Sequence, residues 1–178
     1  MISDWDCLER ARQGDERAWQ WLVVRHSPSL VKTTLLITGS LAIAKDLTQE
    51  SFFRLLDRSP RHRHGSFKAY LSTIAYRLAL KEKKRKSHYV DLEDYEPTDT
   101  SPTPLEEMLQ EERQRQIAQV IGALPEHQRS ILILRFYGQH SYEEIAQITN
   151  VPLGTVKSRL FHAVKACRQG LREKGILE

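Results

Sequence analysis

The chain has 178 residues, enough for one domain of ordinary size or two small ones. Apolar residues make up 40% and charged residues 28%, a balance that excludes an intrinsically disordered chain. The net charge of +4 is unevenly distributed, because residues 54–86 carry 11 basic and 2 acidic side chains, whereas residues 87–112 carry 9 acidic and no basic ones. Residues 113–178 are basic again, with 10 basic and 5 acidic side chains. Any single charged stretch is explained equally well by a solvated surface, but two basic stretches suggest two contacts with a polyanion such as nucleic acid.

Several classes of protein are not expected from this sequence. The two cysteines, Cys7 and Cys167, lie far apart and outside any Cys/His cluster, which argues against a disulfide framework or a zinc site. The N-terminus is acidic and lacks the apolar run of a signal peptide, and no run is long enough to cross a bilayer. We therefore expect a cytoplasmic protein with no membrane insertion. No carboxylate pair, nucleophile–base set or phosphate-binding glycine loop is present, so we expect neither an enzyme nor a cofactor.

Helical periodicity runs through most of the chain and predicts an all-α fold. The first domain is expected to span residues 1–86 and to contain helices that begin at capping residues: Ser3, Asp15, Ser40 and Ser66. Gly14 and Gly39 are expected to end the first two helices. Pro28 is expected to interrupt or kink the second one.

Residues 87–104 separate this domain from a second one. They contain three prolines and five acidic residues with almost no aliphatic side chains, which is typical of a linker. The helical pattern returns at Leu105 and breaks at Leu124-Pro125. The sequence therefore predicts two small helical domains, residues 1–86 and 105–178, joined by an acidic flexible linker.

The second domain carries the pattern of a helix-turn-helix. Ser141 and Glu144 form an S-x-x-E capping box that opens a short helix, in which the small Ala146 allows close packing. Residues 149–150 make the turn, and Pro152 falls in the first turn of the next helix, where its missing N–H costs little.

The next helix has one apolar and one polar face. The buried stripe is predicted from spacing to consist of Val156, Leu160, Val164 and Cys167. The outward residues carry hydroxyl, cationic, aromatic and imidazole groups, which suit phosphates and the base edges of duplex DNA. They are Thr155, Lys157, Ser158, Arg159, Phe161 and His162. An ordinary helical hairpin with a basic surface is the alternative interpretation.

The first basic stretch, residues 54–86, interleaves its cations with aromatic residues. Such a surface suits a single strand, because cations follow the backbone while rings stack on unpaired bases. The loop Arg61-His62-Arg63-His64 precedes Phe67, Tyr70 and Tyr76 and is short enough to hold a displaced base. Core packing is the alternative for the aromatic residues, and a fortuitous metal site is the alternative for the two histidines.

These residues together resemble the extracytoplasmic-function (ECF) sigma factors of bacterial RNA polymerase, over nearly the whole chain. Three motifs in order carry the resemblance: Ala44-Lys-Asp-Leu-Thr-Gln-Glu-Ser-Phe-Phe53, Phe67-Lys-Ala-Tyr-Leu-Ser-Thr-Ile-Ala75, and Leu124-Pro125 with Tyr142-Glu-Glu-Ile-Ala146 and Gly154-Thr-Val-Lys-Ser-Arg-Leu160. Some positions depart from the family pattern. Lys45 stands for a usual Glu, Tyr70 for Trp, Tyr76-Arg77 for Arg-Asn, and His162 for Arg.

The resemblance implies a role for each region. Residues 1–86 would be sigma region 2, and residues 105–178 would be region 4, with the linker threading the polymerase cleft or serving only as a solvated tether. The face that binds the coiled coil of the polymerase β′ subunit would comprise Asp46, Gln49, Glu50 and Phe53. The melted −10 strand would contact Arg61, His62, Arg63, His64, Tyr70, Tyr76, Arg77 and Lys81. The outward face from Thr155 to His162 would read the −35 duplex.

The predicted function is therefore a sigma factor that directs core RNA polymerase to promoter DNA. Many members of the family are held inactive by an anti-sigma factor, which makes such a protein a candidate partner. A free-standing helix-turn-helix regulator is the alternative, but it leaves the stretch from Asp46 to Phe53 without a purpose.

Overall fold

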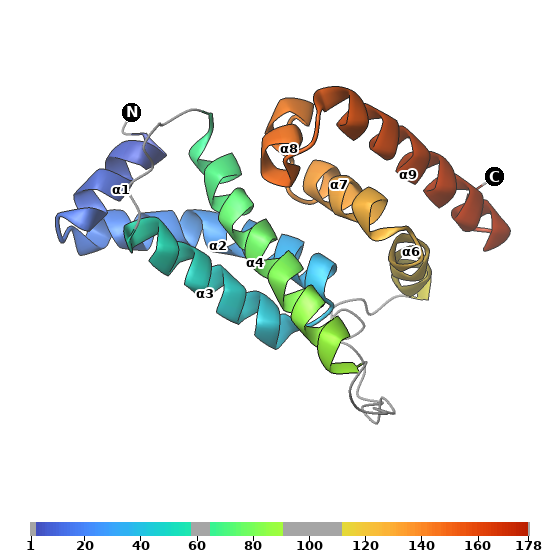
Figure 1. The fold of residues 1–178 in the computed structure, drawn as a ribbon, viewed down its shortest axis with the longest axis horizontal. Coiled ribbons are helices and arrows are strands. Elements are labelled where there is room, and N and C mark those ends of the chain that lie inside the picture. Colours follow the sequence, from blue (N-terminus) through green and yellow to red (C-terminus); the bar gives the residue numbers. More distant parts are fainter. Residues whose placement is uncertain (1–2, 58–64, 91–111, 178) are drawn as a thin grey trace.

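The structure is a computed structural model, and it describes residues 3–57, 65–90 and 112–177. Within these ranges the chain is helical with short turns, which confirms the predicted all-α fold (Figure 1). The helices of the N-terminal half are α1 (Asp4–Arg12), α2 (Glu16–Thr38), α3 (Leu41–Asp57) and α4 (Phe67–Val90). Those of the C-terminal half are α6 (Glu112–Gly122), α7 (Glu126–Phe136), α8 (Tyr142–Thr149) and α9 (Leu153–Glu173).

Local capping explains where the first helices begin and end. The Ser3 side chain accepts a hydrogen bond from the N–H of Asp6 and closes a capping box. Asp15 accepts from the first turn of α2, and Gly39 ends that helix with a φ of 73°, which glycine adopts without strain. The Ser66 hydroxyl accepts from the N–H of Ala69 at 3.1 Å and starts α4. The predicted caps at these positions are confirmed.

Two predicted boundaries differ from the structure. The expected interruption at Pro28 is wrong, because α2 runs through it without a break. A proline inside a helix costs about 3 kcal/mol, but buried residues on both sides, His26 and Leu30, fix the helix against its neighbours. The helix α4 also continues to Val90 and not to about Lys86.

The N-terminal half has its own apolar core. It is built around Leu8, Leu22, Leu55 and Leu71, all 1% exposed or less, and Phe67 of α4 closes it. Full burial of such a side chain stabilises the fold by about 1.5–3 kcal/mol. Trp5 meets the Phe67 ring edge to face, with ring centroids 5.2 Å apart.

The C-terminal half has a second core, and it includes residues of α4. Ile131, Ile145 and Val156 are buried where α7, α8 and α9 meet, and Ala69 of α4 belongs to the same cluster. Accordingly α4 packs against α8, and α2 packs against α7. In Figure 1 α4 lies between the remaining helices of the two halves. The halves are therefore in direct contact.

Neither a membrane span nor a metal cluster is found among the described residues. None of their helices is both long and apolar enough to cross a membrane. In the same part of the chain, no three His, Cys, Asp or Glu side chains are grouped so that they could hold a metal ion.

Candidate nucleic-acid interface

The helix α9 is held by one buried face. Val156, Leu160 and Ala163 are at most 6% exposed and pack against α7 and α8. The predicted stripe of four residues is thus confirmed in part, because Val164 and Cys167 are only half-buried at its edge. This packing fixes which side of the helix is available to a ligand.

The opposite face of α9 is open and cationic. Lys157, Ser158 and His162 are exposed, and Phe161 is 65% exposed. The Phe161 and His162 rings touch edge to face, with centroids 5.5 Å apart. Thr155 and Arg159 flank this face and are half-buried. All six residues predicted to read the duplex therefore lie on one side of one helix or at its margin.

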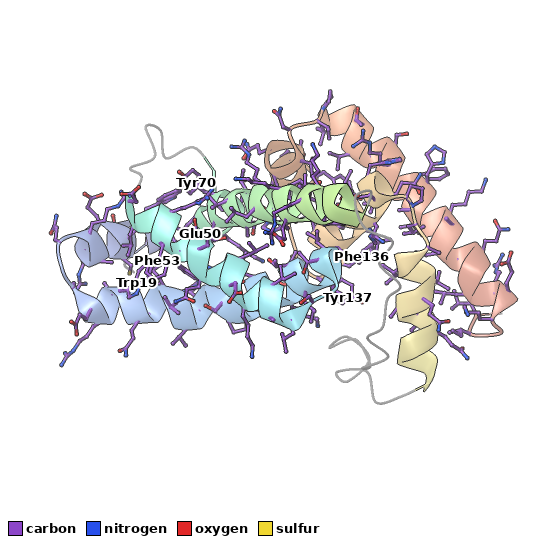
Figure 2. The ribbon with its side chains drawn as sticks, turned by 60° about the horizontal axis from the view of Figure 1, so that its bottom comes forward. Trp19, Glu50, Phe53, Tyr70, Phe136 and Tyr137 are labelled. Carbon is purple, nitrogen blue, oxygen red and sulfur yellow. The ribbon has the colours of Figure 1, made fainter. Side chains whose placement is uncertain are left out.

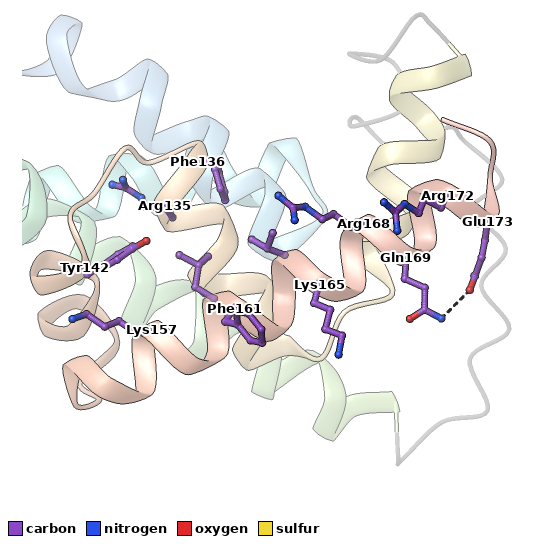
Figure 3. Close-up of a pocket in the computed structure, with 12 residues that line it drawn as sticks. Arg135, Phe136, Tyr142, Lys157, Phe161, Lys165, Arg168, Gln169, Arg172 and Glu173 are labelled. Atoms are coloured by element: carbon purple, nitrogen blue, oxygen red, sulfur yellow. Dashed lines mark hydrogen bonds between the residues drawn. The ribbon is translucent and has the colours of Figure 1, made fainter. Parts of the chain in front are cut away.

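The structure extends this face toward the end of α9. Lys165 and Arg168 are exposed and follow Phe161 at helical spacing, so they lie on the same side of the helix. They line a groove of about 980 Å³ that also includes Phe136 of α7 (Figure 3). These two cations were not among the residues predicted to read the duplex, although their helical spacing from Lys157 and Phe161 is visible in the sequence.

The turn that precedes α9 is built by the predicted residues. Ser141 accepts from the N–H of Glu144 at 3.1 Å, and Glu144 accepts from the N–H of Ser141 at 2.9 Å, so the capping box is confirmed. Asn150 ends α8 with a φ of 54°, a conformation that asparagine tolerates. Burial would raise the pKa of Glu144, but hydrogen bonds from Ser66 and Ser141 outweigh it and lower the pKa.

The residues predicted to contact the melted strand differ in exposure where the structure describes them. Arg77 and Lys81 are exposed on α4, one turn apart. Tyr70 is half-buried and packs on Trp5, with ring centroids 5.5 Å apart. The loop residues Arg61, His62, Arg63 and His64 lie outside the described residues.

Tyr76 lies where the two halves of the protein meet. It is half-buried among residues of both halves, and its side chain is hydrogen-bonded to that of Ser130 on α7. Burial raises the pKa of the Tyr76 hydroxyl, while the hydrogen bond to Ser130 and the charge of Arg159 act against it. Tyr76 and Arg159, predicted to contact different parts of a promoter, are therefore near each other.

The polymerase-binding residues predicted from the sequence line α3. Asp46 and Gln49 are exposed, Phe53 is 55% exposed, and Glu50 is half-buried. Figure 2 shows Glu50 and Phe53 along this helix. The Glu50 carboxylate accepts from Arg54 Nε at 2.7 Å. The face thus combines acidic groups with an exposed aromatic ring.

A buried histidine lies between α4 and the helix-turn-helix. His140 is 1% exposed, and its Nε2 is 3.0 Å from the Ser72 hydroxyl of α4. Its Nδ1 lies 3.5 Å from the Glu144 carboxylate, which is beyond a good hydrogen bond. Burial, with Lys68 nearby, lowers the pKa of His140. Gly138 lies against it, since an added Cβ there would come within 2.7 Å of the imidazole.

Comparisons with known proteins agree with this arrangement. Residues 22–89 match the family described as Sigma-70 region 2, and residues 114–167 match Sigma-70, region 4. The chain is 34% identical to the ECF RNA polymerase sigma-E factor of Haemophilus influenzae, over 92% of each chain. It is 28% identical to the RNA polymerase sigma-H factor of Pseudomonas aeruginosa, over 95% of this chain and 94% of that one.

Solved structures share the fold. The sigma factor RpoE in complex with the anti-sigma factor NepR from Bartonella quintana superposes with a TM-score of 0.69 at 21% identity, covering 86% of this chain and 96% of that one. CnrH in complex with the cytosolic domain of CnrY gives a TM-score of 0.66 at 18% identity, and the match covers 94% of this chain and 96% of that one. The chain belongs to the sigma-70 family of RNA polymerase sigma factors, and within it to the extracytoplasmic-function class.

Proposed function

We propose that this sigma factor contacts the promoter at two places and the polymerase at a third. In this proposal residues 1–86 act as region 2, residues 105–178 act as region 4, and residues 87–104 link them. The observation that carries the proposal is the exposed face of α9, where Lys157, Phe161 and His162 project from a helix whose other side is buried.

The α9 face has the properties of a duplex reader. The major groove of B-DNA is about 12 Å wide and admits one α-helix. Lys157, Lys165 and Arg168 would follow the phosphates, while Ser158 and His162 approach base edges of the −35 element. An imidazole cannot make the bidentate contact with guanine that arginine makes, so His162 favours a base preference different from that of a family member with arginine there.

Region 2 would hold the melted −10 strand. Arg77 and Lys81 offer exposed cations on α4, and the loop from Arg61 to His64 is expected to hold a displaced base. Tyr70 would supply a ring surface once the strand is in place. Tyr76 could join it only after the contact with Ser130 is broken.

The partners of the proposal are core polymerase and an anti-sigma factor. The face made by Asp46, Gln49, Glu50 and Phe53 would bind the coiled coil of the β′ subunit, and the protein would act in the cytoplasm, where the polymerase is. An anti-sigma partner is supported by the two solved structures, which are complexes with NepR and with CnrY. A free-standing helix-turn-helix regulator would leave the match of residues 22–89 to Sigma-70 region 2 unexplained.

The test is transcription by core polymerase with and without the purified protein. Templates would be fully duplex promoters and promoters with a pre-melted −10 bubble. We expect promoter-dependent transcripts only when the protein is present. Their absence on both templates would overturn the proposal.

Two substitutions separate the two surfaces. Gln49→Ala should lower the affinity for core polymerase and leave the binding of isolated −35 duplex unchanged. Lys157→Ala should weaken the binding of isolated −35 duplex and leave the affinity for core polymerase unchanged. If both variants lost the same activity, the division into a polymerase face and a duplex face would be wrong.

A further inference from the structure

A polar cavity of about 550 Å³ lies beside α1, α2, the start of α4 and the segment that joins α7 to α8. Small-molecule sites commonly have volumes of about 300–1,000 Å³, so the cavity is large enough for a small ligand. Its described lining includes no residue of α9 or α3 and is therefore separate from the duplex and polymerase faces. The titratable side chains and the aromatic ring of this lining are Asp4, Arg25, His26, Lys32, Lys68 and Tyr137.

The cavity carries more positive than negative charge. Asp4 is the one acidic residue of its described lining, and it is already engaged twice. One carboxylate oxygen lies 2.8 Å from His26 Nε2, and the other lies 3.9 Å from Arg25 Nε. In the part of the chain that the structure describes, Lys32 and Lys68 form no ion pair with a carboxylate. Two lysine charges in the cavity are therefore left without an acidic partner there.

Lys68 is in an unusual position for an ammonium group. It is half-buried on α4, near two buried histidines. Burial is the largest cause that lowers the pKa of His26 and of His140, and the charge of Lys68 lowers both further. Residues 58–64, which precede α4 in the sequence and lie outside the described ranges, include no acidic residue. Because withdrawing a charge from water costs free energy unless it is paired, an anion bound in this cavity would offset that cost.

The remaining wall supplies hydrogen-bond donors and a fixed backbone. Ser29 and Tyr137 are half-buried and carry hydroxyl groups. Lys32 Nζ lies 5.1 Å from the centroid of the Tyr137 ring, and this cation–π contact holds the ammonium at the wall. Gln139 has a φ of 54°, a conformation that is uncommon for a residue other than glycine and that clusters at ligand-binding sites. Donors on α2, on α4 and before α8 thus face one cavity.

We propose that this cavity binds a small molecule that carries a phosphomonoester group, with Lys32 and Lys68 as its main contacts. Such a group has a charge of about −1.5 to −2 at pH 7 and three acceptor oxygens. Its charge matches the two lysines that lack a carboxylate, and its oxygens can accept from the hydroxyls of Ser29 and Tyr137. This inference goes beyond the proposed function, which assigns none of these four residues to promoter DNA or to polymerase.

The test is a calorimetric titration of the full chain with phenyl phosphate, and with phenol as the ligand that lacks the phosphate. We expect saturable binding of one phenyl phosphate per chain and no binding of phenol. The double variant Lys32→Gln and Lys68→Gln should bind phenyl phosphate at least about tenfold more weakly, because each lysine donates a charge-assisted hydrogen bond. The matched control, Lys157→Gln with Lys165→Gln, removes two charges from α9 and should bind as the wild type does. Circular dichroism checks that both variants keep native helix.

A variant of opposite sign provides a second measurement. Asp4→Asn removes the acidic charge from the described lining and should bind phenyl phosphate more tightly than the wild type, so unchanged or weaker binding would contradict the proposal. Absence of saturable binding to the wild type, or an equal loss in the α9 control, would also overturn it. A single-stranded −10 oligonucleotide is the last arm. If Lys32→Gln with Lys68→Gln weakened that strand and left phenyl phosphate unaffected, the cavity would belong to the strand path and the proposal would be wrong.

Discussion

His140 and His26 are buried histidines that both lie beside α4, against Ser72 and Phe67, and their titration links folding to pH. Burial, with Lys68 nearby, lowers the pKa of His140 below 6.5. Burial also lowers the pKa of His26, although Asp4 accepts a hydrogen bond at 2.8 Å and acts in the other direction. Protonation of either group therefore favours the unfolded chain.

The free energy of unfolding should be constant above about pH 6.5 and fall as the pH drops below that value, because the unfolded chain then binds more protons. Urea unfolding from about pH 5 to about pH 8 measures this. His140→Gln should be less stable at neutral pH and should have a flatter profile below pH 6.5. The exposed control His127→Gln should keep the wild-type profile. A profile of His140→Gln parallel to the wild type would contradict the prediction.

Lysines on the exposed face of α9 should determine the salt dependence of duplex binding. Removing one lysine–phosphate interaction reduces the slope of log K against log salt by about 1. Lys157→Ala and Lys165→Ala should each do so, as measured by fluorescence anisotropy on a −35 duplex. Lys45→Ala removes the same charge from α3 and should leave the slope unchanged. An unchanged slope in Lys165→Ala would mean that the duplex interface ends before that turn.

The role of a single residue could be predicted on α9 but not at every position. The six predicted −35 residues are placed together because helical spacing defines a face without knowledge of its neighbours. Tyr76 is different. A tyrosine within a basic helix suits base stacking, but its hydrogen bond to Ser130 depends on a residue 54 positions along the chain, which no local pattern reveals.

At the scale of the helices, α8 and α9 carry residues that stabilise the fold on their buried faces, and α9 carries residues predicted to contact DNA on its exposed face. Ile145 is fully buried between these helices, whereas Phe161 is 65% exposed. Ile145→Ala should lower the free energy of unfolding by about 2–5 kcal/mol, because the cavity it leaves is only partly filled. Phe161→Ala should change it by less than about 0.5 kcal/mol.

The same two variants should differ in duplex binding too, but here Phe161→Ala should be the impaired one. Phe161→Ala should weaken it while the protein stays folded, and Ile145→Ala should retain it at temperatures where circular dichroism shows native helix. Urea unfolding and a duplex titration under one buffer condition make the comparison. Equal losses of stability in both variants would show that Phe161 is part of the core.

Helix ends were predictable where a side chain caps its own backbone, as at Ser3, Asp15 and Ser141, because the interaction spans only three residues. The interruption at Pro28 was predicted from the same local chemistry and is wrong. The difference lies in tertiary packing, since buried residues before and after the proline hold α2 as one helix. Local rules describe the cost of such a residue but not the contacts that offset it.

At the scale of the whole molecule, the sequence predicted two domains on a tether, with no sign that they touch. Amphipathic periodicity shows that α4 has apolar faces but not which helix covers each one. Ala69 and Ala79, small residues within a helix, carry no signal that another domain packs on them. The contact between the halves is therefore visible only in three dimensions.

This contact should make the two halves unfold together. All three tryptophans, Trp5, Trp19 and Trp21, lie in the N-terminal half, whereas circular dichroism reports on helices of both halves. In the wild type the two signals should follow one urea transition. Ile133→Ala removes a fully buried side chain between α7 and the N-terminal half and should separate the two curves. Coincident curves in this variant, or separate curves in the wild type, would contradict the coupling.

Gly138 has a consequence for mutational tolerance. It lies between α7 and the helix-turn-helix, where an added Cβ would meet both the His140 ring and the Leu134 carbonyl oxygen at 2.7 Å. Any side chain there must displace the imidazole from Ser72 or shift the backbone that leads into α8. Position 138 reads no base and binds no polymerase in the proposed scheme. Even so, a screen for loss of promoter activity should recover substitutions at this position alongside those on the α9 face, since the segment leads into α8 and its His140 contacts Ser72 of α4.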